Sequence, residues 1–287
     1  MIIAVVSGKG GTGKTTVSTG LFYYMQKHIS APVQLVDCDA EEPDCHIFLD
    51  AARISDIPIA VSMPEIDNKS CTYCGKCKKA CAFNAIIMLP SADFIEVVHD
   101  MCHACGACAY VCPENAIHEI PVQIGEINFY RRKVNNDFFE GRIKIGSTLQ
   151  TRVIRKTLKH LQEGGIVILD APPGTSCPVV AVVTKADYVL MVTEPTPFGL
   201  YDLKLMTETV KQVNKKHGVI INKAGLGFDP LYRFLDNHHI PLVGEIPFKR
   251  EFAKICAEGK ILPAEEQQLE EIFGNIVENV LDGKGYN

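Results

Sequence analysis

The N-terminal segment MIIAVVSGKGGTGKTT constrains the fold more than any other part of this 287-residue chain. A short apolar, β-branched run at 2–6 breaks into glycines, and the residues that follow, VSTGLFYYMQKH, have helical spacing. This order predicts a strand, a loop and a helix. Gly8, Gly13, Lys14 and Thr15 fit the P-loop pattern, in which backbone N–H groups and a helix N-terminus hold phosphates.

The residues of this loop have distinct expected roles. Lys14 is expected to reach the β- and γ-phosphates of ATP, and Thr15 to bind Mg²⁺. A glycine-rich turn without a ligand is the alternative, but here the strand, the lysine and the hydroxyl occur together. The residues that we expect to contact ATP or ADP in this segment are Gly8, Gly10, Gly11, Thr12, Gly13, Lys14, Thr15 and Thr16.

Two later apolar runs end in aspartates. PVQLVDCDAEEPD predicts a strand that ends at Asp37, with Asp39 just beyond it, and GGIVILDAPPGT predicts a buried strand that ends at Asp170. The carboxyl ends of parallel strands form the usual ligand crevice of an α/β sheet, so we expect these carboxylates near Mg²⁺ or water. Any one of them alone is more often a cap or turn residue. We interpret Asp170 as a Walker B carboxylate that acts on Mg²⁺ through its water shell.

The loop GKGGTGKTT closely resembles that of the MinD, ParA, Mrp and nitrogenase iron protein group, which has an additional lysine at the position of Lys9. The resemblance implies an ATPase that forms an ATP-dependent homodimer, in which Lys9 reaches the nucleotide of the partner. It also implies that Asp39 orients the attacking water, and that the segments around Asp39 and Asp170 are the two switches. Lys9, Lys14, Asp39 and Asp170 are therefore the expected catalytic residues.

Two further positions extend this resemblance. GVIINKAG places Asn222 at the end of an expected strand, and VGEIPFKR places Pro247 just after another. Similar positions in the group hold the adenine ring, through the Asn amide and through the backbone around the Pro. Ordinary turn residues are the alternative at both positions.

Eight of the twelve cysteines lie between 71 and 112, in two copies of the pattern C-x-x-C-x-x-C-x-x-x-C. The copies CGKCKKACAFNAI and CGACAYVCPENAI align without a gap. This is the spacing of bacterial ferredoxins with two 4Fe-4S clusters, in which the fourth cysteine of each copy binds the other cluster. Paired zinc sites are the alternative. The expected ligand sets are Cys71, Cys74, Cys77 and Cys112 for one cluster, and Cys102, Cys105, Cys108 and Cys81 for the other.

Cys177 lies seven residues after Asp170, as does a cluster ligand of the nitrogenase iron protein after its second-switch aspartate. A cluster that bridges two subunits needs a second ligand from each, and the sequence has no cysteine between 113 and 176. A small buried thiol is therefore the expected role of Cys177.

The apolar runs predict a mostly parallel, doubly wound α/β sheet with a P-loop, covered by helices on both faces. Its expected strands lie near 2–6, 33–37, 166–170, 187–192, 218–222 and 241–245. The cysteine repeat interrupts this pattern between the two switches. We therefore expect a P-loop ATPase domain at 1–63 and 122–287, with an inserted small α+β ferredoxin-like domain at 64–121.

Composition excludes several other classes of protein. The net charge of −5 argues against a nucleic-acid-binding surface. No apolar run is long enough to span a membrane, and the N-terminus does not have the pattern of a signal peptide, so we expect a cytoplasmic protein. The C-terminal segment EEQQLEEIFGNIVENVLD has helical spacing but no basic residue, so we expect no membrane anchor of the MinD type.

Three functions fit these features. ATP binding and hydrolysis could gate electron transfer from the two clusters to a redox partner. The chain could instead be an Mrp-type carrier that delivers iron-sulfur clusters to an acceptor protein, or a ParA/MinD-type regulatory ATPase with a redox sensor. Eight cysteines that enclose both clusters fully suit holding and reducing a cluster more than releasing it, which favours the first function.

Overall fold

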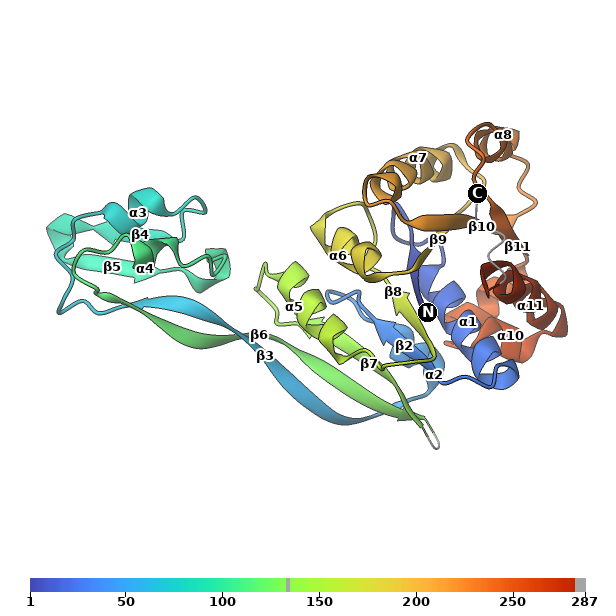
Figure 1. The fold of residues 1–287 in the computed structure, drawn as a ribbon, viewed down its shortest axis with the longest axis horizontal. Coiled ribbons are helices and arrows are strands. Elements are labelled where there is room, and N and C mark those ends of the chain that lie inside the picture. The colour runs from blue at the N-terminus through green and yellow to red at the C-terminus, as the bar shows by residue number, and fades with distance from the viewer. Residues whose placement is uncertain (133–134, 282–287) are drawn as a thin grey trace. The chain divides into compact units, whose positions relative to one another are not determined.

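The computed structural model describes residues 1–132 and 135–281, and the chain divides into two compact units (Figure 1). The larger unit contains Met1–Asp56, Ile127–Arg142 and the chain from Ile154 onward. The smaller one contains Ile57–Glu126 and Ile143–Val153. We call it the cysteine unit because both cysteine repeats lie in it. It differs from the expected insertion at 64–121 by longer flanks and by the separate segment Ile143–Val153.

A nine-stranded sheet has the order β11-β10-β9-β1-β8-β2-β7-β6-β3. The strands are β1 (Ile2–Val6), β2 (Val33–Asp37), β3 (Ala52–Ile66), β6 (Ile117–Arg132), β7 (Asn135–Ile143), β8 (Ile166–Asp170), β9 (Tyr188–Thr193), β10 (Lys216–Ala224) and β11 (Leu242–Pro247). Neighbours from β11 through to β7 pair in parallel. The prediction of a mostly parallel α/β sheet is confirmed.

The central strands are apolar because helices cover the sheet on both faces. All five residues of β8 are buried, as are all five of β2. The helices outside the cysteine repeats are α1 (Lys14–His28), α2 (Cys45–Leu49), α5 (Gln150–Thr157), α6 (Cys177–Lys185), α7 (Pro197–Gln212), α8 (Asp229–Asn237), α9 (Arg250–Ala257), α10 (Leu262–Glu265) and α11 (Gln267–Leu281). Among the described residues, no helix is both long and apolar enough to cross a membrane.

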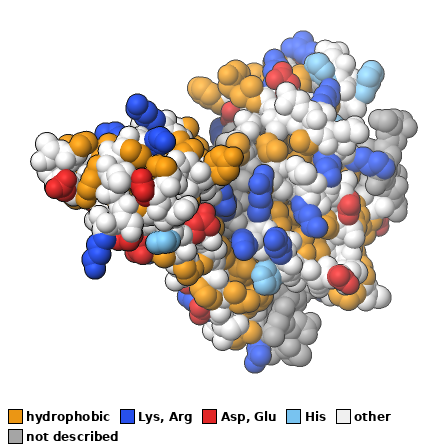
Figure 2. Space-filling model, turned by 60° about the vertical axis from the view of Figure 1, so that its left-hand side comes forward, with side chains coloured by type: hydrophobic (Ala, Val, Ile, Leu, Met, Phe, Trp, Pro, Cys, Tyr) orange, Lys and Arg blue, Asp and Glu red, His pale blue; other side chains and the backbone are white. Residues whose placement is uncertain are grey.

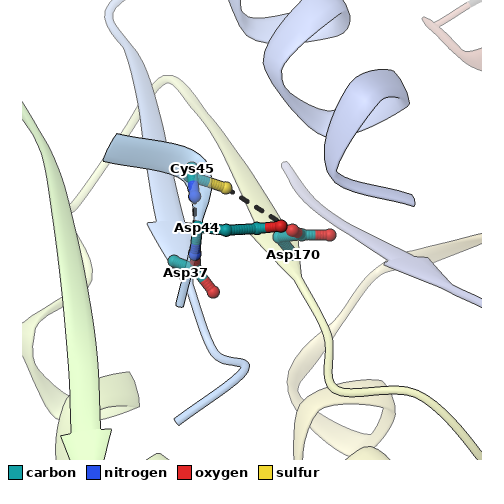
Figure 3. A group of neighbouring side chains, drawn as sticks. All are labelled: Asp37, Asp44, Cys45 and Asp170. Atoms are coloured by element: carbon teal, nitrogen blue, oxygen red, sulfur yellow. Dashed lines mark hydrogen bonds between the residues drawn. The ribbon is translucent and has the colours of Figure 1, made fainter. Parts of the chain in front are cut away.

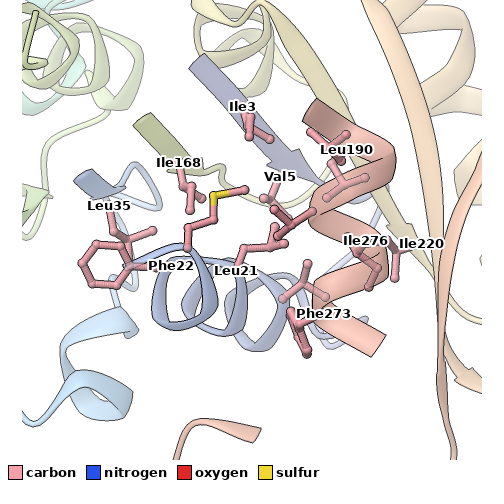
Figure 4. Close-up of a cluster of buried hydrophobic side chains, with 14 of the residues drawn as sticks. Ile3, Val5, Leu21, Phe22, Leu35, Ile168, Leu190, Ile220, Phe273 and Ile276 are labelled. Atoms are coloured by element: carbon pink, nitrogen blue, oxygen red, sulfur yellow. The ribbon is translucent and has the colours of Figure 1, made fainter. Parts of the chain in front are cut away.

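Helix α1 packs against α11 in the core of the larger unit (Figure 4). Leu21 and Phe22 of α1 and Phe273 and Ile276 of α11 are fully buried there. Gly20 allows this close approach, because a Cβ atom at its position would lie 2.4 Å from Cζ of Phe273. The predicted C-terminal helix therefore buries its apolar face against the P-loop helix.

The cysteine unit contains short elements. They are α3 (Lys76–Ala80), β4 (Ile86–Leu89), β5 (Phe94–Val97) and α4 (Ala107–Tyr110), with single 3-10 turns at Pro90–Ala92 and His99–Met101. Strands β4 and β5 form an antiparallel hairpin. Ile86, Ile95 and Ile117 pack with Cys77 and Cys108 in a small buried cluster. The cysteines therefore form part of the packing of this unit.

Substitution of Gly20 tests the contact between α1 and α11. Gly20→Val should lower the free energy of unfolding by about 2–3 kcal/mol, because the buried ring of Phe273 has no room to move. Phe273→Leu in the same chain should recover part of that loss, since the two sites are in contact. Chemical denaturation of the four proteins of this cycle measures the coupling. Additive effects of the two substitutions would contradict the packing described.

Candidate functional site

The P-loop connects the end of β1 to the first turn of α1. Gly13 is the residue before the helix, with a left-handed φ of 94°. Lys14 is buried, and no ion pair holds it within the described part of the chain. The Thr12 hydroxyl is also buried and has no hydrogen-bond partner among the described residues. A buried ammonium beside a buried hydroxyl that accepts or donates no hydrogen bond within the described residues fits the phosphates of a nucleotide.

The carboxylate of Asp170 joins three segments of the chain. Thr15 Oγ1 donates to Asp170 Oδ2 at 2.8 Å, and Ser18 Oγ donates to Asp170 Oδ1 at 2.9 Å. The thiol of Cys45, at the start of α2, donates to Oδ2 at 3.4 Å. The structure thus brings together the predicted pair Thr15 and Asp170. Sequence analysis missed Ser18 and Cys45, although Ser18 follows Thr15 by about one helical turn.

Asp37 holds the loop that follows β2. Its Oδ1 accepts the N–H of Asp39, and its Oδ2 accepts the N–H groups of Asp44 and Cys45, each at 3.0 Å. Figure 3 shows Asp37 and Asp170 at the ends of β2 and β8, together with Asp44 and Cys45 at the start of α2. One ligand atom of each lies within 4.8 Å of the others. Asp44 is a site residue that sequence analysis missed.

Burial changes the protonation of these carboxyl groups. It raises the pKa of Asp37 and of Asp170, because the charged form loses hydration. Burial also raises the pKa of Asp39 to about 7, although the Lys14 ammonium opposes the shift. A divalent cation would offset the loss of hydration, and Mg²⁺ prefers such oxygen ligands. The chemistry of these groups therefore fits Mg²⁺ bound together with a nucleotide.

Lys9 is held within its own chain. Its Nζ lies 2.5 Å from Oε1 of Glu194, and Lys223 Nζ lies 3.0 Å from Oε2 of the same carboxylate. Lys223 Nζ also donates to the carbonyl of Gly11 at 3.4 Å. The two lysines depress the pKa of Glu194 against the opposing effect of burial, so the carboxylate is charged at neutral pH. Sequence analysis missed Glu194, which directly follows β9, and Lys223, which lies near the end of β10.

The remaining predicted contacts lie around the loop. Asn222 Nδ2 donates to the carbonyl of Thr12 at 2.8 Å, and its Oδ1 accepts the N–H of Lys223. Both ends of this amide therefore bond within the protein, and its predicted contact with adenine stays a prediction. Pro247 is the last residue of β11, opposite Ala224 of β10. The other loop positions, Gly8, Gly10, Gly11 and Thr16, follow β1 or begin α1.

The eight cysteines of the repeats line two cavities, each of about 350 Å³ including space open to solvent. Each cavity combines three cysteines of one repeat with the last cysteine of the other. One is lined by Cys71, Cys74, Cys77 and Cys112, and the other by Cys81, Cys102, Cys105 and Cys108. These are the same two groups that the sequence pattern predicts as ligand sets.

The backbone turns toward the sulfur atoms in the same way in both repeats. Tyr73 and Ala104 have left-handed φ angles of 51° and 50°. Their N–H groups donate to Cys71 Sγ and Cys102 Sγ, each at 3.4 Å. Such N–H···S bonds stabilise thiolates and the clusters that thiolates bind. Two tetrads of thiols that share these bonds fit 4Fe-4S clusters.

Cys177 is exposed, so the prediction of a buried thiol is wrong. It is the first residue of α6, which follows the Pro-Pro-Gly turn after β8. The first turn of a helix after an irregular segment leaves this side chain open to solvent.

The parallel sheet, the P-loop and the carboxylates at its edge define a P-loop nucleotide-binding protein. The family model of the CobQ/CobB/MinD/ParA nucleotide binding domain matches residues 3–262. The chain therefore belongs to that family.

The chain is also similar to individual proteins. The chain is 32% identical to the uncharacterized protein MJ0579 of Methanocaldococcus jannaschii, over 79% of this chain and 81% of the relative. It is 31% identical to MJ0578 of the same organism, over 86% of each. A structure of the septum site-determining protein MinD of Pyrococcus horikoshii with Mg-ADP has the same fold, at a TM-score of 0.60 and 18% identity, covering 100% of this chain and 99% of that one.

Substitution of Gly13 tests the geometry of the loop. A Cβ atom at this position would lie 2.3 Å from Asn222 Nδ2, which holds the Thr12 carbonyl. Gly13→Ala should therefore weaken binding of Mg-ATP by roughly tenfold or more, which is about 1.4 kcal/mol. Isothermal titration calorimetry measures this affinity. Gly164→Ala is the matched control, because Gly164 has a similar φ of 78° but open space around it. Equal affinities of the two variants would contradict the proposed fit.

Proposed function

We propose that this chain is an ATP-binding and ATP-hydrolysing iron-sulfur protein. In this proposal, the nucleotide state of a homodimer gates electron transfer from two 4Fe-4S clusters to a partner protein. The observation that carries the proposal is that one chain combines a P-loop site with two cavities, each lined by four cysteines. When bound, the clusters supply one-electron redox chemistry that amino-acid side chains do not provide.

Different residues of the nucleotide site would contact the phosphates, the Mg²⁺ ion and the attacking water. Lys14 and the N–H groups of the loop would neutralise the β- and γ-phosphates. Thr15, which contacts Asp170, would hold Mg²⁺, and Asp170 would act through the metal's water shell. Asp39, with a pKa of about 7, would orient the attacking water. Membership of the CobQ/CobB/MinD/ParA nucleotide binding domain family supports nucleotide binding at this site.

Lys9 would complete this site in the homodimer. In the free chain Glu194 holds Lys9, and Glu194 retains a second lysine partner, Lys223, when Lys9 leaves. The transfer of Lys9 to the partner's nucleotide would therefore not leave the Glu194 carboxylate without a counter-charge.

A continuous segment connects the nucleotide site to the cysteine unit. Helix α2 begins at Cys45, whose thiol contacts Asp170 and whose N–H contacts Asp37. Strand β3 begins at Ala52, shortly after α2, and enters the cysteine unit at Ile57. A bound Mg²⁺ with its γ-phosphate would compete with Cys45 for the carboxylate of Asp170, so binding and loss of the γ-phosphate would move α2, as in other nucleotide switches.

A second connection runs through the buried carboxylate of Glu140. This residue lies on β7, directly opposite Asp37 of β2. Its Oε1 accepts from Asn128 Nδ2 of β6 at 3.2 Å and from Arg142 Nε at 3.0 Å, and His46 Nδ1 of α2 lies 3.3 Å from its Oε2. Since β6 continues from the cysteine unit, both α2 and β6 depend on one carboxylate beside the nucleotide site.

The pairing of cysteines can be tested by iron content. Cys112→Ala should reduce the iron of the reconstituted protein from about eight to about four atoms per chain, because one cluster loses a ligand. Addition of Cys74→Ala should cause little further loss, since Cys74 lines the same cavity. Addition of Cys105→Ala instead should remove nearly all iron. Cys177→Ala is the control and should retain both clusters. Loss of all iron in the variant with Cys74→Ala and Cys112→Ala would contradict the crossed pairing.

The central prediction of the proposal is that the bound nucleotide changes the redox properties of the clusters. An anaerobic redox titration followed by EPR should show two 4Fe-4S signals whose potentials or mutual coupling differ between ADP and a non-hydrolysable ATP analogue. Lys14→Ala should abolish this difference while preserving the signals, because it weakens only nucleotide binding. Signals that do not respond to nucleotide would contradict gating. Transfer of the clusters to an apo-acceptor protein would then favour the carrier function.

A further inference from the structure

The two cysteine repeats share their backbone but differ in charge. The sequences align without a gap, and the positions of Lys76, Lys78 and Lys79 in the first repeat correspond to Ala107, Ala109 and Tyr110 in the second. Helices α3 and α4 occupy equivalent places, each after the second cysteine of its repeat. The three lysines are therefore not required for the backbone that holds the cysteines, because the second repeat forms it without them.

These lysines lie on the short helix α3, whose first residue borders the first cavity. Lys76 lines the cavity of Cys71, Cys74, Cys77 and Cys112. All three lysine side chains are exposed, and no ion pair holds them within the part of the chain that the structure describes. Figure 2 shows Lys and Arg side chains that stand out from the surface of the cysteine unit, at the left of the view.

The loop of the second repeat is in contact with another segment of the cysteine unit. Arg152 Nη2 donates to the carbonyls of His103 and Ala104, at 3.1 and 3.0 Å, and Thr148 Oγ1 donates to the carbonyl of Asp100 at 3.3 Å. His103 stacks on Phe83, with ring centroids 3.7 Å apart. The segment Ile143–Val153 therefore donates hydrogen bonds to the loop of the second repeat, and both segments belong to the cysteine unit. Cys74 and the equivalent Cys105 are both exposed, but in the first repeat the three lysines follow Cys74 on α3.

We propose that the face formed by Lys76, Lys78 and Lys79 is the docking surface for an acidic one-electron carrier protein. This inference rests on the proposed function, since it places the carrier at the cavity of Cys71, Cys74, Cys77 and Cys112. Uncompensated like charges at a surface attract a partner of opposite charge and raise its rate of association by about ten- to a thousandfold. The exchange moves one electron between the carrier's redox group and the cluster, and neither protein forms or breaks a bond.

A protein fits this surface better than a membrane or a nucleic acid does. Glu114 lines the same cavity as Lys76, so a carboxylate lies beside the basic face. A polyanion with evenly spaced charges would meet this carboxylate as well as the lysines. A folded acidic protein can match a limited patch of positive charge and leave its border in contact with water.

The first measurement is binding, which does not depend on turnover. The triple variant Lys76→Ala, Lys78→Ala and Lys79→Tyr copies the second repeat, so it should fold and retain both clusters. Surface plasmon resonance with immobilised oxidised flavodoxin of strongly negative net charge should show at least about tenfold weaker binding of this variant at low ionic strength. High ionic strength should weaken binding of the unmodified chain toward the level of the variant.

A control variant separates this surface from net charge. Lys159→Ala, Lys185→Ala and Lys211→Ala together remove the same charge from exposed positions of the larger unit and should leave binding unchanged. In stopped-flow experiments, the hydroquinone of flavodoxin should reduce the triple variant about tenfold more slowly than the control variant, whereas dithionite should reduce both equally.

Several outcomes would overturn the docking surface. Equal flavodoxin binding by the two triple variants would do so, as would loss of binding on Tyr110→Ala alone. Lysine-dependent binding to phosphatidylserine vesicles or to single-stranded DNA, without binding to flavodoxin, would assign the face to a different class of partner. Absence of iron from the reconstituted unmodified chain would instead refute the proposed function, so the two failures are distinguishable.

Discussion

The carboxylate of Asp170 is the group on which the arrangement of the nucleotide site depends. It ends the central strand β8 and accepts hydrogen bonds from Thr15, Ser18 and Cys45. These donors come from the P-loop helix and from α2, so one buried carboxylate fixes two helices against the edge of the sheet. A buried carboxylate is costly unless hydrogen bonds and a nearby cation compensate its charge. The site is therefore most stable when a cation and a phosphate complete it.

The same physical constraint extends outward along the sheet. Asp37 is fully buried on β2 and directs its oxygens to backbone N–H groups, while Glu140 is fully buried on the neighbouring β7. Each carboxylate holds a segment that leads toward the cysteine unit, α2 in one case and β6 in the other. Buried charges with several partners have few alternative arrangements of low energy, which is a property that a switch between two discrete states requires.

The cysteine unit is under a different constraint: it is small, so it has little apolar area to bury in a core. Its hydrophobic cluster includes the cysteines themselves, so ligation and packing are not separate in this part of the chain. Duplication gives both repeats the same left-handed turns at Tyr73 and Ala104. The two repeats differ outside these turns. The first has lysines on α3, and the loop of the second accepts hydrogen bonds from the segment Ile143–Val153. A duplicated framework can therefore present two different surfaces around two similar cavities.

The sequence by itself determined the local features of this protein. Strands β1, β2 and β8, the P-loop and the spacing of the cysteines all follow from residues close together in the chain, where periodicity and glycine positions restrict the backbone. The tertiary structure decided which distant residues meet. Cys45 reaches Asp170, 125 positions away, only because the sheet places β2 beside β8. Glu194 likewise meets Lys9 across 185 positions, and no local pattern in the sequence encodes such a contact. Long-range pairing depends on the order of strands and on the burial of charge, and both are properties of the whole fold.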